Sequence, residues 1–472
     1  MVINKKKGAF AMLTVKIAYI GGGSRGWART LMNDLAQQND FLAEVALYDI
    51  NVESAEKNAK IGNDLALRED VIGKHTYTVA STLEAALTGA KFVVLSILPG
   101  TFEEMASDVH LPEKYGIYQS VGDSSGPGGI LRALRTVPIY AEFARAIEKY
   151  CPDAWVINYT NPMTLCTAAL YRVFPGIKAF GCCHEVFNTQ KLIARAFQEH
   201  YGEKISHKDV RIDVTGINHF TWITGAKYKE YDLFELYREF AQKYRNDGYY
   251  LDSNKTNKTD YFAYDNKVKF DLFLRFGAIA AAGDRHLAEF CPGKWYLENP
   301  EEVDRWGFSL TPVSWRVQNM EERIAKTDRI YNGEEPFKLY RSDEEGVLLM
   351  KALLGVIPPF VTNCNLPNRG QAPDLALGAI VETNAVFSSD AVTPVCAQPL
   401  PKGAHALVER IVNEQAMLLD AAINSDYALA FECMLADPLV TVTPKQAKQM
   451  YLEMLRNTEQ YLPKVSEYLD KN

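Results

Sequence analysis

The sequence predicts an α/β fold, with a Rossmann-type, doubly wound parallel sheet at the N-terminus and a mixed α+β domain at the C-terminus. Three observations predict it. Short apolar runs rich in Val and Ile alternate with helical patterns through the first 200 residues or so, as expected for a parallel sheet covered by helices on both faces. A glycine-rich turn follows the first apolar run. From about residue 225 the alternation is lost, and charged, aromatic-rich helical segments replace it.

The predicted strands and helices alternate along the first half of the chain. Most of the strands lack a polar alternation, which is typical of strands buried on both faces. Two patterns near the C-terminus, at residues 406–423 and 444–462, are helical. We expect a tail at 1–11, a dinucleotide-binding domain at 12–200 and a substrate-binding α+β domain at 201–472. The predicted strands are 15–20, 45–48, 92–97, 154–158, 178–180 and 212–217, and the clearest helices between them are 27–38 and 131–150.

Composition excludes several classes of function. The formal net charge of -8 over 472 residues argues against a nucleic-acid partner. Lys16 interrupts the apolar run near the N-terminus, so we expect no export signal. No segment approaches the roughly 20 apolar residues of a membrane span. The eight cysteines are scattered and form no CxxC pair, which predicts free thiols in a reducing cytoplasm rather than disulfides or structural zinc.

A glycine-rich turn with GxGxxG spacing, at residues 21–26, lies between the first predicted strand and a predicted helix. Such glycines let the backbone approach a pyrophosphate, whose charge faces the helix N-terminus. Asp49 ends the next strand, where an acid accepts from the ribose hydroxyls and favours NAD over NADP. The alternative is a turn that binds nothing, and for Ser96 the alternative is an ordinary strand-to-loop turn. The predicted cofactor-binding residues are Gly21, Gly23, Ser24, Gly26, Asp49 and Ser96.

Polar side chains follow three of the later predicted strands. Asn161 follows one, Cys183 the next, and His219 another. Ligands bind beyond the carboxyl ends of parallel strands, so we expect these residues to face one crevice. Cys183 and His219 are candidate metal ligands, and their chemistry alone favours zinc. The alternative is a cysteine that packs as a small apolar side chain and a histidine with a structural role.

Seven motifs together resemble glycoside hydrolase family 4, the glycosidases that depend on NAD and a divalent metal. They are IGGGSRGW, GDSSGPGGILRALRTVP, INYTNPM, GCCHEV, GINHFTW, LPNRGQAPDLALGAIVET and CAQPLP, and they span nearly the whole chain. The resemblance implies a lactate and malate dehydrogenase type of fold. It also implies a reaction in which NAD⁺ oxidises C3 of the sugar, the C2 proton is removed, the aglycone is eliminated, water adds, and NADH returns the hydride.

The resemblance also implies roles for individual residues. The metal, usually Mn²⁺ in this family, is expected on Cys183 and His219. Asn161 matches an asparagine that contacts substrate hydroxyls, and Asp123 matches an acidic position near the sugar and the metal.

The chain departs from the 6-phosphoglycosidase branch at the expected acid and base. His184 and Glu185 follow the metal cysteine, where that branch has an aspartate acid. The stretch AAGDRHLAEF contains Asp284 and His286 but no tyrosine base. We assign Asp284 as the base and His184 as a contact to substrate or leaving group, with His286 as a further catalytic candidate. The alternative is a surface salt-bridge cluster of Asp284, His286 and Glu289.

The pattern Cys-His-Glu-Val resembles the family members that cleave α-linked uronic acids, α-galacturonidases in particular. The carboxylate of a uronate needs a basic partner, and Arg285 and Arg369 are the candidates for it. Glu185 is predicted to contact another part of the substrate. The alternatives are α-glucuronides, neutral α-galactosides or α-glucosides, a 2-hydroxy-acid dehydrogenase and a non-enzymatic NAD sensor. The family suggests a homodimer or homotetramer that acts on a small saccharide in the cytoplasm, without nucleic-acid or membrane partners.

Overall fold

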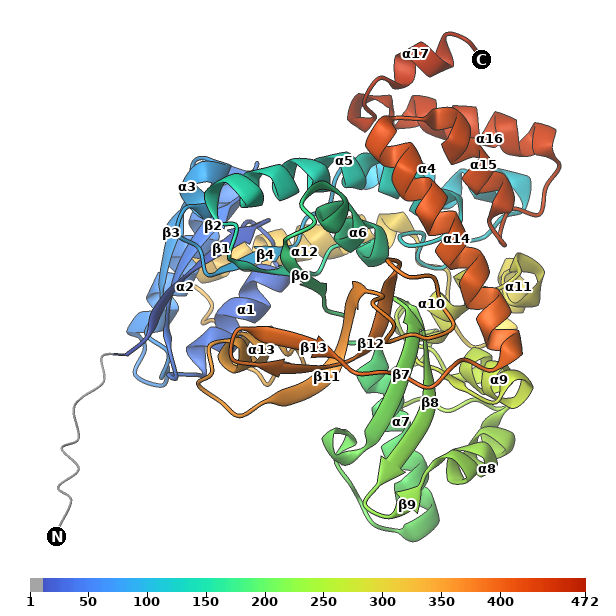
Figure 1. Ribbon diagram of the computed structural model, residues 1–472, viewed down its shortest axis with the longest axis horizontal. Coiled ribbons are helices and arrows are strands. Elements are labelled where there is room, and N and C mark those ends of the chain that lie inside the picture. The colour runs from blue at the N-terminus through green and yellow to red at the C-terminus, as the bar shows by residue number, and fades with distance from the viewer. Residues whose placement is uncertain (1–11) are drawn as a thin grey trace.

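The computed structural model describes residues 12–472, and the predicted tail at 1–11 lies outside the described residues (Figure 1). Its main sheet has nine strands, of which six are parallel in the order β3-β2-β1-β4-β5-β6. This is the strand order of a dinucleotide-binding Rossmann fold, and it confirms the predicted fold class. The parallel strands are β1 (Thr14–Ile20), β2 (Leu42–Tyr48), β3 (Thr76–Val79), β4 (Phe92–Leu95), β5 (Trp155–Asn158) and β6 (Lys178–Gly181).

Helices cover both faces of this sheet, and alternate residues of β1 show why. Ile17 and Tyr19 pack into one core with α1 (Trp27–Ala36), α2 (Val52–Leu67) and α13 (Gly346–Leu353). Ala18 and Ile20 pack into a second core on the opposite face. The helices of that second face are α3 (Leu83–Leu87), α5 (Gly126–Tyr150) and α6 (Met163–Val173). Because successive strand residues point to opposite faces, a strand that is apolar throughout fits only between two helical layers.

The predicted strand at 212–217 is present as β7 (Arg211–Ile217), but its expected place in the parallel sheet is wrong. It pairs antiparallel with β8 (Phe220–Tyr228) in a second sheet, which β9 (Tyr231–Asp232) and β10 (Ile279–Ala280) complete. Only two residues connect β7 to β8, which is a hairpin connection, whereas parallel neighbours need a long crossover.

Three strands from the C-terminal half extend the main sheet beside β6. They are β11 (Phe360–Pro367), β12 (Ile380–Ser388) and β13 (Ala391–Pro394), and all pair antiparallel. Asn365 of β11 lies opposite Gly181 of β6. β12 also lies against the second sheet, where Asn384 Nδ2 donates to the carbonyl of Ile212 over 2.6 Å. The main sheet therefore contains strands from both predicted domains, and the boundary at residue 200 stays a prediction.

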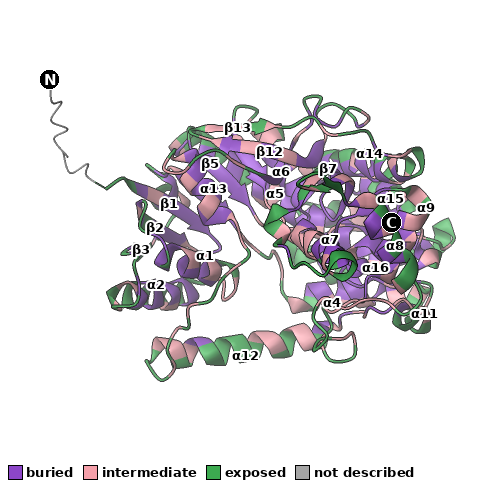
Figure 2. Cartoon of the chain, turned by 90° about the horizontal axis from the view of Figure 1, so that it is seen from below, coloured by how far each residue is buried: buried purple, intermediate pink, exposed green. Residues whose placement is uncertain are grey.

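The remaining helices surround the second sheet and the outer side of α5. Figure 2 shows α12 as a long, largely exposed or half-buried helix along one side, between α2 and α4.

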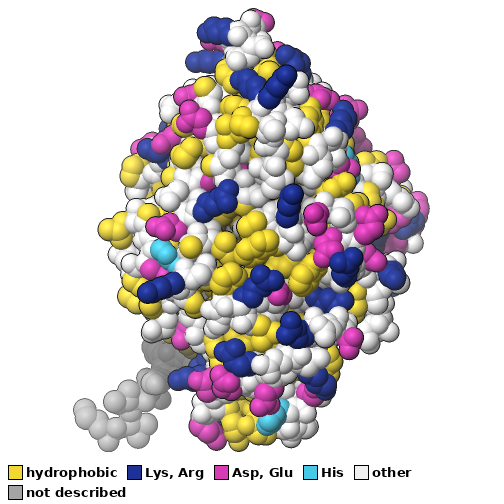
Figure 3. Space-filling model, turned by 90° about the vertical axis from the view of Figure 1, so that its right-hand side faces the viewer, with side chains coloured by type: hydrophobic (Ala, Val, Ile, Leu, Met, Phe, Trp, Pro, Cys, Tyr) yellow, Lys and Arg dark blue, Asp and Glu magenta, His cyan; other side chains and the backbone are white. Residues whose placement is uncertain are grey.

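On the face that Figure 3 shows, acidic and basic side chains are interspersed around a group of hydrophobic ones. Within residues 12–472, no helix combines the length and apolarity that crossing a bilayer requires. The helices are α4 (Phe102–His110), α7 (Glu185–Tyr201), α8 (Phe234–Tyr244), α9 (Lys267–Phe276), α10 (Asp284–Glu289), α11 (Pro300–Arg305), α12 (Val313–Tyr331), α14 (Lys402–Asn424), α15 (Tyr427–Ala436), α16 (Pro444–Asn457) and α17 (Val465–Leu469).

Candidate active site

The glycine-rich turn between β1 and α1 forms a close-fitting backbone cradle. Gly21 has a φ of 95°, and a Cβ atom there would lie 1.9 Å from the carbonyl oxygen of Ser96. Gly23 N donates to Asp49 Oδ2 over 2.8 Å. Ser24 Oγ accepts from Trp27 N over 3.1 Å at the start of α1. The turn thus brings the residues predicted to hold a cofactor together at the carboxyl ends of β1, β2 and β4. Only glycine fits at Gly21, because the turn lies directly against the carbonyl of Ser96, and a tight turn at this end of a Rossmann sheet is where a dinucleotide binds.

A second group joins three elements that are distant in sequence. Asp123 precedes α5, His219 lies in the β7–β8 turn, and His286 is on α10. One ligand atom of each lies within 4.8 Å of the others. Asp123 Oδ2 accepts from Asn161 Nδ2 over 3.2 Å, and its Oδ1 accepts from Ser124 Oγ over 2.7 Å. Two imidazoles and a carboxylate suit a divalent cation of the Mn²⁺ or Zn²⁺ type.

The electrostatics of this group favour ligand-competent protonation states. Burial lowers the pKa of His286 to about 3, and the neighbouring His219 adds to the shift. Burial also lowers the pKa of His219. Burial alone would raise the pKa of Asp123, but His219, Arg132 and His286 hold it well below its ordinary value. The group therefore presents neutral imidazoles and an ionised carboxylate, the forms that bind a metal.

Cys183 lies nearby, between β6 and α7, but outside that three-residue group. Its carbonyl oxygen accepts from Asn363 Nδ2 over 3.2 Å. Burial raises the pKa of its thiol well above the usual range, and Glu382 and Glu185 add to the shift. A protonated thiol becomes a ligand only when a cation displaces its proton. The assignment of Cys183 as a metal ligand therefore stays a prediction.

The two residues after Cys183 point to different neighbours. His184 Nδ1 lies 2.9 Å from Glu344 Oε1, and its side chain is partly exposed. Glu185 Oε2 accepts from Gly283 N over 2.9 Å. Burial would raise the pKa of Glu185, but His286, His184 and His219 lower it to about 2. Glu185 is therefore an ionised carboxylate beside the two imidazoles.

The structure places Asp284 in a different environment. It is fully buried, and its carboxylate oxygens accept from Val268 N over 3.2 Å and Lys269 N over 3.1 Å. These N–H groups belong to the first turn of α9, so Asp284 stabilises the start of that helix. Burial raises its pKa, while the buried Lys269 ammonium opposes that rise. To reach a substrate, this carboxylate would have to leave these backbone partners.

The two arginines predicted to meet a uronate lie at opposite ends of the sheet. Arg285 is buried on α10 and donates to the carbonyl of Ser120 over 2.7 Å. Arg369 is exposed, and with Trp155 and Lys178 it lines a pocket of 260 Å³. β11 runs antiparallel to β6, so the residues that follow it return to the amino end of the parallel strands. Arg369 is therefore remote from the Asp123 group.

Tyr264 is not among the predicted site residues, and Glu289 is predicted only as part of the alternative salt-bridge cluster. The ring of Tyr264 lies against Gly283, where a Cβ atom would come within 2.6 Å of it, and Glu185 affects its pKa. The loop that carries Tyr264 has no pattern that signals a site. Glu289 Oε1 accepts from Val121 N over 2.6 Å and from Gly122 N over 3.0 Å. Glu289 thus fixes the Asp123 loop to the helix that carries His286, rather than joining a surface salt-bridge cluster.

The sequence and the structure match known proteins over nearly the full chain. The family models described as Family 4 glycosyl hydrolase and its C-terminal domain match residues 16–199 and 214–440. An α-galacturonidase of Thermoanaerobacterium saccharolyticum is 55% identical over 449 residues, which cover 95% of this chain and 96% of the relative.

Two crystal structures share the fold. That of lplD from Bacillus subtilis has a TM-score of 0.90 at 49% identity, covering 94% of this chain and 100% of that chain. A Thermotoga maritima 6-phospho-β-glucosidase, solved with manganese, NAD⁺ and glucose-6-phosphate, has a TM-score of 0.73 at 20% identity, covering 95% and 99%.

Proposed function

The chain belongs to glycoside hydrolase family 4, and from this premise we propose that it cleaves α-linked galacturonic acid from oligosaccharides. Membership of the family makes it a glycosidase. The relative that is 55% identical is named an α-galacturonidase, and it is matched along almost its entire length. The observation that carries the proposal is the group of Asp123, His219 and His286, which lies next to Asn161 beyond the carboxyl end of β5.

NAD and Mn²⁺ fit the residues that are present. The cradle of Gly21 and Gly23 accepts a dinucleotide backbone, and Asp49 lies where a ribose is expected. Asp123, His219 and His286, with Cys183 as a further candidate ligand, suit a divalent cation. When bound, the two groups supply a hydride acceptor and a positive charge that polarises sugar oxygens. The related Thermotoga maritima structure holds manganese and NAD⁺ together, which supports this pairing.

The residues of this chain position the sugar and move its protons. Asn161 is fixed by Asp123, and its Oδ1 is buried without a partner within residues 12–472, so it is free to accept from a sugar hydroxyl. Once C3 is oxidised, the proton on C2 becomes acidic and a base must accept it. Asp284 remains the proposed base and His184 the proposed contact to the leaving group. Glu185 is an ionised acceptor for a further hydroxyl.

The compartment and the oligomeric state are part of the same proposal. All eight cysteines are free, which supports a reducing cytoplasm. We expect a homodimer or a homotetramer. Light scattering on the protein as it leaves a size-exclusion column would give the molar mass that decides between them.

The test is hydrolysis of p-nitrophenyl α-galacturonide with and without NAD⁺ and Mn²⁺. The proposal expects turnover that needs both, with no net formation of NADH, because the hydride returns to the sugar. Net NADH formation would indicate a dehydrogenase instead. A panel with the α-glucuronide, α-galactoside and α-glucoside separates the alternatives, and faster cleavage of the neutral galactoside would overturn the uronide assignment.

A further inference from the structure

Three arginines lie around Asp123 without a carboxylate partner. They are Arg132 on α5, Arg285 on α10 and Arg316 on α12. Within residues 12–472, none of the three forms an ion pair with an aspartate or glutamate, whereas seven other arginines do. Arg132 is close enough to lower the pKa of Asp123, and Asp123 in turn affects the pKa of Arg285 and Arg316. Three cations therefore share one small region.

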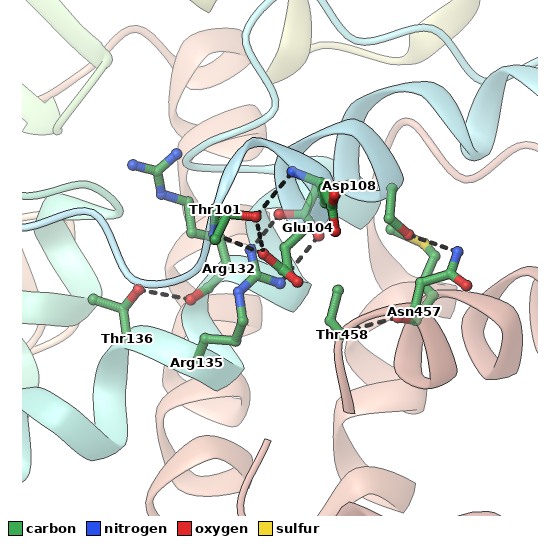
Figure 4. Close-up of polar contacts among 12 residues, drawn as sticks. Thr101, Glu104, Asp108, Arg132, Arg135, Thr136, Asn457 and Thr458 are labelled. Atoms are coloured by element: carbon green, nitrogen blue, oxygen red, sulfur yellow. Dashed lines mark hydrogen bonds and ion pairs between the residues drawn. The ribbon is translucent and has the colours of Figure 1, made fainter. Parts of the chain in front are cut away.

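Arg132 and Arg135 differ in this respect, because Arg135 has a carboxylate partner and Arg132 has none in the described part of the chain. Both are on α5, one turn apart. Arg135 Nη1 donates to Asp108 Oδ1 over 3.1 Å in a buried ion pair. Figure 4 shows the guanidinium of Arg132 extending away from that pair. Its Nε donates to the carbonyl of Asn161 over 3.2 Å, and its Nη atoms donate to no residue that the structure describes. Arg132 thus keeps its Nη donors free beside Asn161, the residue predicted to contact substrate.

Arg316 of α12 and Arg285 of α10 both lie against the ring of Phe262. The guanidinium of Arg316 lies 5.6 Å from the centroid of the Phe262 ring, and that of Arg285 lies 4.9 Å from it. Arg316 donates no hydrogen bond to a described residue. The Nε of Arg285, which is 94% buried, also has no partner there. Stacking on an aromatic ring holds a guanidinium in place while its N–H groups stay available for an anion.

The carboxylates within this region do not balance the three cations. Asp123 is one of the three members of the candidate metal group. Glu185 is also ionised and acts on Arg285, but burial raises the pKa of Glu289 to about 8, so two full carboxylate charges face three guanidinium groups. A buried cation without a counter-ion is costly, and an incoming carboxylate removes that cost through charge-assisted hydrogen bonds. The region is therefore complementary to an anion.

We propose that Arg132 and Arg316, with Arg285 behind them, form the binding site for the carboxylate of the sugar substrate. This inference rests on the proposed function, because only a uronide brings such a group. A dinucleotide phosphate is the other possible anion, but the glycine cradle has its own cation. A Cβ atom at Gly26 would lie 3.0 Å from Arg323 Nη1, which is about two turns along α12 from Arg316. The same helix therefore faces the cofactor with Arg323 and the sugar with Arg316.

Arg316→Gln is the primary test, since this side chain makes no hydrogen bond that the fold needs. The matched control is Arg329→Gln on the same helix, where the arginine pairs with Glu335 on the surface. The measurements are kcat and KM for p-nitrophenyl α-galacturonide, and calorimetric binding of free galacturonate and galactose. We expect Arg316→Gln to raise KM and weaken galacturonate binding by about 10- to 100-fold, with kcat changed less. Galactose binding and the affinity for NAD⁺ should stay as in the wild type.

The outcomes separate this inference from the function on which it rests. If the wild type cleaves the galacturonide but neither Arg316→Gln nor Arg132→Gln weakens galacturonate binding, the arginine site is wrong and the function stands. If the wild type binds and cleaves only neutral sugars, the proposed function fails and the inference fails with it. If Arg316→Gln weakens NAD⁺ instead of galacturonate, the anion is the dinucleotide phosphate, and the inference is overturned.

Discussion

The imidazole rings of His219 and His286 lie with their centroids 3.8 Å apart and their planes inclined by 31°. Two imidazolium ions at this distance would repel each other, so the two rings are not protonated together. Burial lowers the pKa of both, so they remain neutral at physiological pH. Asp123 lies beside them and remains ionised. The pair therefore has nitrogen lone pairs available to a cation.

We expect His286→Ala to weaken Mn²⁺ binding by more than about 100-fold, because it removes one of three converging ligand atoms. The measurement is the free Mn²⁺ signal by electron paramagnetic resonance during titration of the protein, which does not depend on activity. The control is His200→Ala, where the histidine faces Glu239 on the surface. Unchanged affinity in His286→Ala would remove this residue from the metal site.

Cys183 can be tested separately from the histidines. We expect Cys183→Ser to reduce Mn²⁺ affinity by at least about tenfold, as loss of a ligand or of its immediate support should. Loading the protein with Co²⁺ provides a second readout, because a sulfur ligand gives a charge-transfer band that the serine variant should lack. Cys182→Ser is the matched control, since Cys182 packs against an apolar core. A band that survives in Cys183→Ser would exclude thiolate ligation by Cys183.

Asp284 carries a structural role that the sequence does not reveal. We expect Asp284→Asn to lower the free energy of unfolding by about 1.5–3 kcal/mol, because a charged acceptor for two N–H groups of α9 is lost. Because Asp284 is also the proposed base, the variant should lower kcat by about 100- to 10,000-fold at temperatures where it is folded. Urea unfolding and steady-state kinetics measure the two effects separately. A destabilised variant with normal kcat would leave Tyr264→Phe as the next test of the base.

The sequence predicts those features of the fold that are local. Each strand of the Rossmann half is a short apolar run followed by a helical pattern, so the order of elements is readable. The short β3 (Thr76–Val79) is missed, since this edge strand reads TYTV and lacks the continuous apolar run of the equally short β4. The addition of β11 beside β6 is also missed, because pairing between segments far apart in sequence leaves no local pattern.

The site residues that directly follow a strand are predictable from the sequence, and those placed by tertiary contacts are not. Asn161 and Cys183 follow parallel strands, as expected, and Asp123 and His219 converge with Asn161. His286 reaches the site because α10 folds against the β7–β8 turn, and Tyr264, in the loop before α9, because its ring packs against Gly283. The positions of Asp284 and Arg369 are decided by tertiary contacts, one at the start of α9 and the other at the amino end of β6.

Two buried carboxyl groups near the start of α5, those of Glu414 and Asp437, should make the free energy of unfolding depend on pH. Glu414 of α14 and Asp437 are both buried, and burial raises the pKa of each, that of Asp437 to about 6. Asp437 Oδ2 accepts from Gly126 N over 2.8 Å at the start of α5, directly after the Asp123 loop. Since the folded pKa values exceed the unfolded ones, the folded state binds more protons. Stability should therefore fall as pH rises from about 4 through 6 and above.

We expect Glu414→Gln to weaken this dependence, because an amide can donate to Asp437 without a shared proton. The variant should gain about 1 kcal/mol or more over the wild type at pH 8, and less at pH 5. Urea unfolding at a series of pH values measures the difference. The control is Glu409→Gln, whose carboxylate is exposed on the same helix. A constant offset between Glu414→Gln and wild type across the whole pH range would show that the pair does not share a proton.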